Sequence, residues 1–237
     1  MNAFQRLSGR AVVALLGLAS LSAVWFAAAH ADETPRAVPL PVTDTKTPGS
    51  ELETAVLAGG CFWGVEGVFQ HVKGVRQVLA GYSGGSKATA TYLLVGTEMT
   101  GHAESVQIKF DPREISYGKI LRIYFSVAHD PTQLNRQGPD SGTSYRSNIF
   151  FTTAEQERIA KAYITQLDKA HIFSNPIVTR VDPLKGFYAA ESYHQDFLIH
   201  NPDNPYIVAN DMAKIANLKR LLPEYYRDQP VMGAKPS

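Results

Sequence analysis

Apolar positions follow two alternating periods from about residue 55 to residue 222. Residues 104–110 alternate apolar and polar side chains as a half-buried strand does, whereas Val65, Val68, Phe69 and Val72 recur at helical spacing. These patterns predict strands at 55–58, 75–80, 104–110, 147–151 and 177–181. They also predict helices that open near 61 and that cover 115–128, 153–170, 188–198 and 211–222.

Several predicted helices carry residues that favour their ends. Ser116 is a candidate N-cap, Thr153 and Gln156 form a capping-box pattern, and Pro223 stops the last helix. We find no internal repeat. Because strands and helices alternate, we expect an α/β (α+β) two-layer sandwich. Its mixed sheet would hold a ferredoxin-like split β-α-β core, with additional helices and long loops.

The N-terminal segment has the pattern of a secretory signal. Arg6 and Arg10 precede an uncharged run over 11–29, and an Ala-His-Ala sequence ends at Ala31. We expect cleavage after Ala31, export to the periplasm or the medium, and no stable membrane association afterwards. The alternative is an uncleaved membrane anchor at 11–29. Residues 32–50, which contain four prolines, are expected to be a linker, and 51–237 a single catalytic domain.

Composition and charge exclude several classes of protein. A hydrophobic content of 44% fits one soluble globular domain, which we expect to be a monomer. Removing residues 1–31 takes away two arginines and no acid, so the formal charge of +1 becomes −1 and no nucleic-acid partner is indicated. The seven histidines form no metal-ligand pattern with one cysteine, so we expect no metal and no bound cofactor.

Residues 60–66 read GCFWGVE and contain Cys61, the only cysteine of the chain. The glycines at 59 and 60 break a strand, so Cys61 falls in the turn that opens a helix, where unpaired backbone amides favour a thiolate. Most lone cysteines are small buried hydrophobes, but the rings of Phe62 and Trp63 indicate a pocket with an aromatic wall. Glu66 is expected to stabilise the helix dipole from the first turn.

Two further segments are candidates for chemistry. Glu104 shares the face of its strand with the apolar residues at the alternate positions 106, 108 and 110. Partial burial there would keep its carboxyl protonated near neutrality, as a general acid requires. The alternative is that this strand end is solvated and Glu104 points to water. Residues 129–145 form a polar, Gly- and Pro-containing stretch, and structureless loops of this length are uncommon unless they are functional.

Three motifs together resemble the A-type peptide methionine sulfoxide reductases. They are GCFWGVE at 60–66, GHAE at 101–104 and DPTQLNRQGPDSGTSYRS at 130–147, and the resemblance extends from about residue 55 to about 206. The family implies reduction of methionine-S-sulfoxide, in oxidised proteins or as the free amino acid. It also implies that Cys61 is the nucleophile and becomes a sulfenic acid.

The resemblance also implies roles for the other motif residues. Glu104 would donate a proton to the sulfoxide oxygen, and Tyr92 and Tyr145 would hydrogen-bond that oxygen. Asp140 would lie at the rim and position water or the tyrosines. The substrate-binding wall for the S-methyl group would be formed by Phe62 and Trp63.

The chain departs from the family pattern at three places. Many members carry further cysteines near the C-terminus, whereas residues 201–237 contain none. Leu93 and Leu94 stand where acidic residues are expected, and Gly96 stands where a cysteine is frequent. Without a resolving cysteine, the sulfenic acid requires an external thiol reductant, which would be a thioredoxin-like or glutaredoxin-like protein or a small thiol.

Two other functions remain open on the sequence. A cysteine hydrolase or acyl transferase would use Cys61 with His102 or His194 as the base, although the spacing selects neither histidine. A non-catalytic peptide-binding domain would use Phe62 and Trp63 as anchors.

Overall fold

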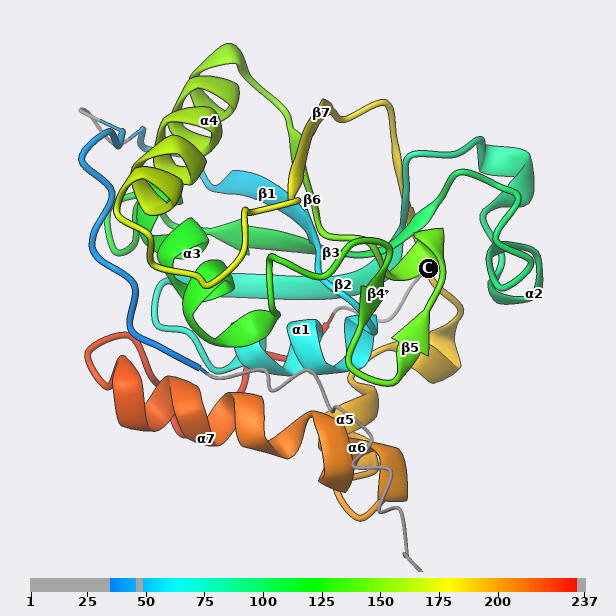
Figure 1. Ribbon diagram of the computed structural model, residues 1–237. Helices are drawn as coiled ribbons and strands as arrows, with labels where there is room; N and C mark the ends of the chain where they lie inside the picture. The colour runs from blue at the N-terminus through cyan, green and yellow to red at the C-terminus, as the bar shows by residue number, and fades with distance from the viewer. Residues whose placement is uncertain (1–34, 46–48, 234–237) are drawn as a thin grey trace, which may run out of the picture.

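The computed structural model describes residues 35–45 and 49–233 as a mixed six-stranded sheet with helices packed around it (Figure 1). Its strand order is β7-β6-β1-β3-β2-β8, and all neighbours are antiparallel except the parallel pair β6 and β7. The strands are β1 (Glu53–Ala58), β2 (Val75–Ser83), β3 (Ala103–Phe110), β6 (Asn148–Phe151), β7 (Arg180–Pro183) and β8 (Phe187–Ala189).

The centre of the sheet is a split β-α-β unit, as the alternation of patterns predicts. Helix α1 (Phe62–Gln70) connects β1 to β2, and β3 lies between these two strands and is antiparallel to both. Strand β1 therefore runs parallel to β2 without pairing with it. Residues at alternate positions of β1 point to opposite faces, because Leu57 joins the main core whereas Val56 joins a small cluster on the other side.

Most helices begin at the residues that the sequence indicates. Ser116 caps α3 (Tyr117–Ile123), and Thr153 caps α4 (Ala154–Lys169) by accepting from the Gln156 backbone N–H. Helix α3 continues as a π-helix, η2 (Tyr124–Ala128), so the expected helix over 115–128 is present with a change of winding. Helix α7 (Met212–Leu221) agrees with the prediction.

The predicted helix over 188–198 is wrong. Tyr188 belongs to β8, the short 3-10 helix η4 (Ser192–His194) follows, and only α5 (Phe197–His200) is α-helical. Asp196 breaks the segment because it has left-handed backbone geometry, with φ of 56°. The predicted strand over 177–181 overlaps β7 only at its end.

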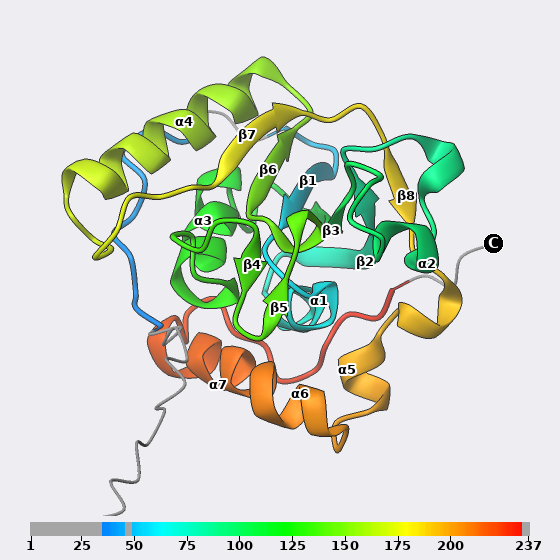
Figure 2. The same cartoon turned by 45° about the vertical axis from the view of Figure 1, so that its right-hand side comes forward.

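Four short elements near the site were missed by the periodicity. The stretch over 129–145 is not structureless, because β4 (Arg136–Gln137) and β5 (Asp140–Ser141) form a small hairpin and η3 (Thr143–Tyr145) follows it. Helix α6 (Pro205–Asn210) precedes α7, and the two helices lie below α1 in Figures 1 and 2. The hairpin and α6 approach the N-terminal end of α1 from two sides (Figure 2).

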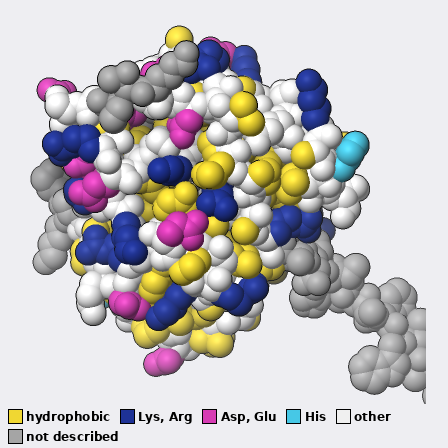
Figure 3. All heavy atoms as spheres, turned by 90° about the vertical axis from the view of Figure 1, so that its left-hand side faces the viewer, with side chains coloured by type: hydrophobic (Ala, Val, Ile, Leu, Met, Phe, Trp, Pro, Cys, Tyr) yellow, Lys and Arg dark blue, Asp and Glu magenta, His cyan; other side chains and the backbone are white. Residues whose placement is uncertain are grey.

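The expected linker over 32–50 is packed against the domain in its described part, residues 35–45. Val38 is 1% exposed, and its backbone N–H donates to the Ser126 hydroxyl. Asp44 accepts hydrogen bonds from the Ser116 hydroxyl and the Gly118 N–H at the start of α3. Prolines favour an extended backbone, and in these residues that backbone lies along the surface of the domain. On the face seen in Figure 3, basic and acidic side chains are interspersed.

The predicted signal sequence, with its cleavage point after Ala31 and its alternative anchor at 11–29, lies outside the described residues. Among the residues that are described, no helix combines the length and apolar character needed to cross a membrane.

Candidate active site

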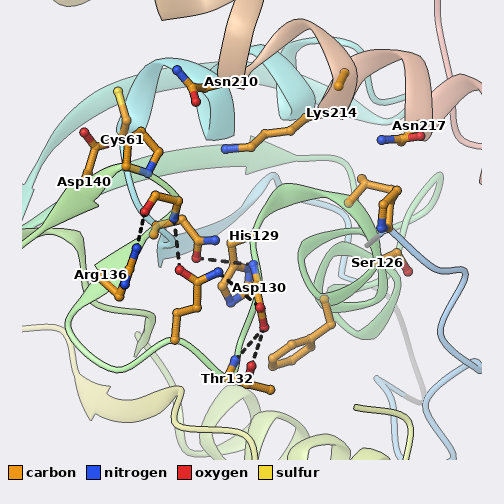
Figure 4. A pocket seen from close by; sticks show the side chains of 18 of the residues that line it. Cys61, Ser126, His129, Asp130, Thr132, Arg136, Asp140, Asn210, Lys214 and Asn217 are labelled. Atoms are coloured by element: carbon orange, nitrogen blue, oxygen red, sulfur yellow. Dashed lines mark hydrogen bonds between the residues drawn. The ribbon is translucent and has the colours of Figure 1, made fainter. Parts of the chain in front are cut away.

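Cys61 occupies the N-cap position of α1, without a side-chain capping hydrogen bond, and lies at one end of a cleft (Figure 4). Gly60 before it has φ of 89°, and a Cβ atom at that position would lie 2.5 Å from the Gln137 side chain. The turn therefore requires glycine both for its backbone angle and for its contact with the hairpin. Cys61 itself is 9% exposed and belongs to the hydrophobic core cluster, and it also lines the cleft.

The electrostatic setting of Cys61 differs from the expectation. Burial raises the pKa of the Cys61 thiol well above its ordinary value, the carboxylates of Glu104 and Asp211 raise it further, and only the Trp63 backbone N–H lowers it. The position at a helix N-terminus by itself predicts a lowered pKa for the thiol. Desolvation outweighs the amide here, so the thiol is protonated at neutral pH.

Glu104 is 4% exposed on β3 and is held beside the start of α1. Its Oε2 accepts a hydrogen bond of 3.0 Å from the Phe62 backbone N–H. Burial raises the pKa of Glu104 to about 8, against the lowering effect of this amide. The alternative of a solvated strand end is therefore wrong, and a protonated carboxyl lies next to the residue that follows Cys61.

Glu104 shares a small pocket of about 270 Å³ with Tyr92, Gly96 and Tyr145. Tyr92 opens the short helix α2 (Tyr92–Val95), and Tyr145 ends η3. Burial, followed by the charge of Glu104, raises the pKa of both tyrosines, so their hydroxyls carry protons at neutral pH. The structure thus brings together both predicted hydroxyl donors and the predicted acid.

Phe62 and Trp63 take different places in the aromatic wall. Phe62 is 1% exposed, and its ring centroid lies 5.1 Å from that of His194. Trp63 is partly buried and stacks on Phe197 at a centroid distance of 3.8 Å, and its Nε1 donates to His194 Nδ1. Because α1 rotates successive residues by about 100°, Phe62 faces the core while Trp63 faces α5.

Asp140 lies at the rim, on β5, and accepts a hydrogen bond from the Tyr206 hydroxyl on α6. Both residues line the cleft that reaches Cys61. Tyr206 is a functional candidate that the sequence analysis missed. The signal for its position was local, because Asn204 and Pro205 are an N-cap and a first helical residue, but nothing along the chain links Tyr206 to Asp140.

Comparison with known proteins agrees with this geometry. A family model described as peptide methionine sulfoxide reductase matches residues 53–224. The chain belongs to the peptide methionine sulfoxide reductase family. This confirms the resemblance seen in its three motifs, and the mixed α/β fold agrees with it.

Two curated relatives are similar over most of their length. The "Peptide methionine sulfoxide reductase MsrA 2" of Mesorhizobium japonicum is 60% identical over 78% of this chain and 94% of its own. The MsrA of Deinococcus radiodurans is 46% identical over 77% of this chain and 86% of its own.

Two solved structures of this family have the same fold. Reduced Mxr1 from Saccharomyces cerevisiae has a TM-score of 0.59 and 32% identity, covering 67% of this chain and 92% of its own. Methionine sulfoxide reductase A of Corynebacterium diphtheriae has a TM-score of 0.56 and 30% identity, covering 73% and 90%.

The histidines considered as hydrolase bases are engaged elsewhere in this reductase fold. His194 Nδ1 accepts from Trp63, and His102 is hydrogen-bonded at both ring nitrogens, to the Gly85 N–H and the Ser86 carbonyl. Burial lowers the pKa of His194. In the described part of the chain, neither ring forms a hydrogen bond with Cys61, so the geometry gives no support to a Cys–His pair.

Glu66 does not act at the first turn of α1, so that expectation is wrong. The helix begins at Phe62, which places Glu66 in its second turn, where its side chain is fully buried. Its Oε2 accepts a hydrogen bond from the Asp196 backbone N–H, and burial raises its pKa to about 8.

Within residues 35–45 and 49–233, no group of three or more His, Cys, Asp and Glu side chains is placed to hold a metal ion.

Proposed function

We propose that this protein reduces methionine-S-sulfoxide, in oxidised proteins and as the free amino acid, with Cys61 as its nucleophile. The observation that carries the proposal is the placement of a protonated carboxyl, Glu104, beside the helix start that presents the only thiol. The family comparison supplies the substrate class. The choice of epimer rests on the A-type motifs and on the fact that each methionine sulfoxide epimer has its own enzyme.

The reaction transfers one oxygen atom. The Cys61 sulfur attacks the sulfoxide sulfur, and the Glu104 carboxyl gives its proton to the sulfoxide oxygen. That oxygen passes to Cys61 as a sulfenic acid while the thioether leaves, and the proton of the original thiol restores Glu104. The sulfoxide sulfur gains two electrons and the cysteine sulfur loses two, so one thiol and one sulfoxide give one sulfenic acid and one thioether.

The surrounding side chains favour this step in three ways. Tyr92 and Tyr145 carry hydroxyl protons that can stabilise charge on the sulfoxide oxygen as the S–O bond weakens. The indole of Trp63, which is only partly buried, would contact the S-methyl group, and Phe62 supports it from the core. Asp140 orients the Tyr206 hydroxyl at the rim of the site.

The catalytic cycle needs thiols from outside the chain because the sequence contains one cysteine. A first thiol attacks the sulfenic sulfur and releases water, giving a mixed disulfide on Cys61. A second thiol resolves it, restores Cys61 and leaves as a disulfide. The reductant is a thioredoxin-like or glutaredoxin-like protein or a small thiol. We further propose that the enzyme works outside the cytoplasm as a monomer, after cleavage at Ala31.

The proposal is tested by presenting the purified enzyme with each methionine sulfoxide epimer and dithiothreitol. Turnover of the S epimer, with none by Cys61→Ser, is the expected result. Mass spectrometry after one equivalent of substrate without reductant should find a trapped sulfenic acid on Cys61. Turnover by Cys61→Ser, or an unmodified Cys61 after substrate consumption, would overturn the mechanism.

A further inference from the structure

The cleft that begins at Cys61 continues well beyond the reacting groups. Its volume is about 980 Å³, whereas the pocket shared by Tyr92, Glu104 and Tyr145 measures about 270 Å³. In Figure 4, Cys61 and Asp140 lie at one end of the cleft, and Ser126 and Asn217 lie at the other. The sulfoxide chemistry needs only the first end, so most of this volume has no part in the mechanism described above.

The walls of the cleft come from segments that are distant in the sequence. One wall is the stretch before and within the β4–β5 hairpin, including Leu134, which is 68% exposed. The opposite wall is formed by α6 and α7, with Ala213 and Asn217 facing the space. Phe173 lines the cleft as well. The lining therefore mixes apolar surfaces with amide groups that can hydrogen-bond a polypeptide backbone.

The charged side chains in the cleft already contact groups within the protein, and among them Lys214 is paired with an opposite charge. Lys214 Nζ lies 3.3 Å from Asp211 Oδ1, and Asp130 accepts from the Thr132 backbone N–H and hydroxyl. Arg136 donates to the Gly138 carbonyl. A lining with this internal pairing suits an uncharged main chain better than a highly charged ligand, because a charged ligand would have to break these pairs.

We propose that this cleft binds the polypeptide on one side of the methionine sulfoxide, so that the residue is read together with its neighbours in the chain. This inference rests on the proposed function, because it takes Cys61 as the point where the sulfoxide side chain arrives. The cleft favours extended, uncharged segments with a side chain that packs on Leu134. It discriminates unfolded stretches of oxidised proteins from the free amino acid through KM.

Helix α7 provides a matched pair of test positions. Ala213 and Ala216 are both exposed on this helix, but only Ala213 lines the cleft. Ala213→Trp fills the cleft, whereas Ala216→Trp places the same ring outside it at the same cost in helix propensity. Circular dichroism verifies that both variants fold. Leu134→Asn, on the opposite wall, is a second probe that removes apolar contact at an exposed site.

The measurement compares kcat/KM for an uncharged ten-residue peptide containing methionine-S-sulfoxide with that for N-acetyl-methionine-S-sulfoxide, using dithiothreitol as reductant. We expect Ala213→Trp to lower the value for the peptide about tenfold more than the value for the small substrate. Leu134→Asn should shift the same ratio in the same direction, and Ala216→Trp should leave it unchanged.

Equal losses for both substrates, or no loss for either, would overturn the cleft assignment. A defect seen only when thioredoxin replaces dithiothreitol would also overturn it, because the cleft would then receive the reductant. Failure of the wild-type enzyme on N-acetyl-methionine-S-sulfoxide is a different result, since it would reject the proposed function itself.

Discussion

Glu104 and Cys61 form an acid and nucleophile pair whose charges depend on each other. Glu104→Gln removes the proton donor and keeps a side chain that can accept from the Phe62 N–H. We therefore expect the single-turnover rate of sulfenic acid formation to fall by about 10²- to 10⁴-fold, as for loss of a general acid, with little change in substrate binding. Rapid mixing with excess enzyme measures both. An unchanged rate would remove Glu104 from the mechanism.

The same variant makes a second prediction about the thiol. The Glu104 carboxylate is the second cause, after burial, of the raised pKa of Cys61. Replacing it by a neutral amide should lower the pKa of the Cys61 thiol, so the alkylation rate with iodoacetamide should rise at a lower pH than in the wild type. Asp140→Asn is the comparison, since Asp140 is the last of the contributing charges. If the rise of the alkylation rate moves to higher pH in Glu104→Gln, the Glu104 carboxylate does not raise the pKa of Cys61.

The hydrogen bond between Tyr206 and Asp140 joins α6 to the hairpin across the rim of the site. Tyr206→Phe removes the donor alone. It should lower kcat/KM by the equivalent of about 1–3 kcal/mol, because the hydrogen bond from a hydroxyl to the Asp140 carboxylate is lost. If the two groups act together, Asp140→Asn combined with Tyr206→Phe should lose less than the sum of the single losses. Additive losses would show that the two side chains work independently.

Residues near each other along the chain were predictable, and residues brought together from distant segments were not. The GCFW turn placed Cys61 at a helix start, and strand parity placed Glu104 toward the core. Tyr206 could not be linked to Asp140, because 66 residues separate them and only the packing of α6 joins them. The raised pKa of Cys61 was also missed, since burial depends on the whole fold.

At the scale of elements, the segment over 35–45 secures α3. Asp44 accepts from the Ser116 hydroxyl and from the Gly118 N–H, which is otherwise one of the unpaired amides of the first turn. Asp44→Ala should destabilise the protein by about 1–2 kcal/mol, a typical cost for losing helix-cap contacts. Urea unfolding measures this, and Asp44→Asn should lose less because it keeps an acceptor. Equal stability of Asp44→Ala and the wild type would mean that the segment is only loosely held.

Elements whose own sequence carries a cap and an apolar pattern were predicted. Elements that form only because they pair with or pack on distant segments were not. Helix α4 has an N-cap, an apolar stripe and sixteen residues, so its sequence suffices. Strand β8 has three residues and exists because it pairs with β2. The same limit applies to the β4–β5 hairpin and to α6, which are too short for periodicity to indicate them.

At the scale of the whole molecule, Glu66 connects the catalytic helix to the C-terminal segment. Its carboxyl accepts from the Asp196 backbone N–H, and the Asp196 side chain accepts from Gln70 and from the Gly233 N–H. Val231 adds a backbone hydrogen bond to Gln70. Burial, followed by the charge of Asp196 among the causes that raise it, brings the pKa of Glu66 to about 8.

Between pH 4.5, the ordinary pKa of the carboxyl, and about pH 8, the folded state binds more protons than the unfolded state. The free energy of unfolding therefore falls as the pH rises through this window. Glu66→Gln removes this contribution and keeps an acceptor for Asp196. We compare the free energy of unfolding of the variant with that of the wild type. We expect this difference to shift in favour of the variant by about 2 kcal/mol or more between pH 5 and pH 8. Urea unfolding at both pH values measures it, with the surface variant Glu155→Gln as control. A gain of the same size at pH 5 would show that better packing, and not protonation, accounts for the effect.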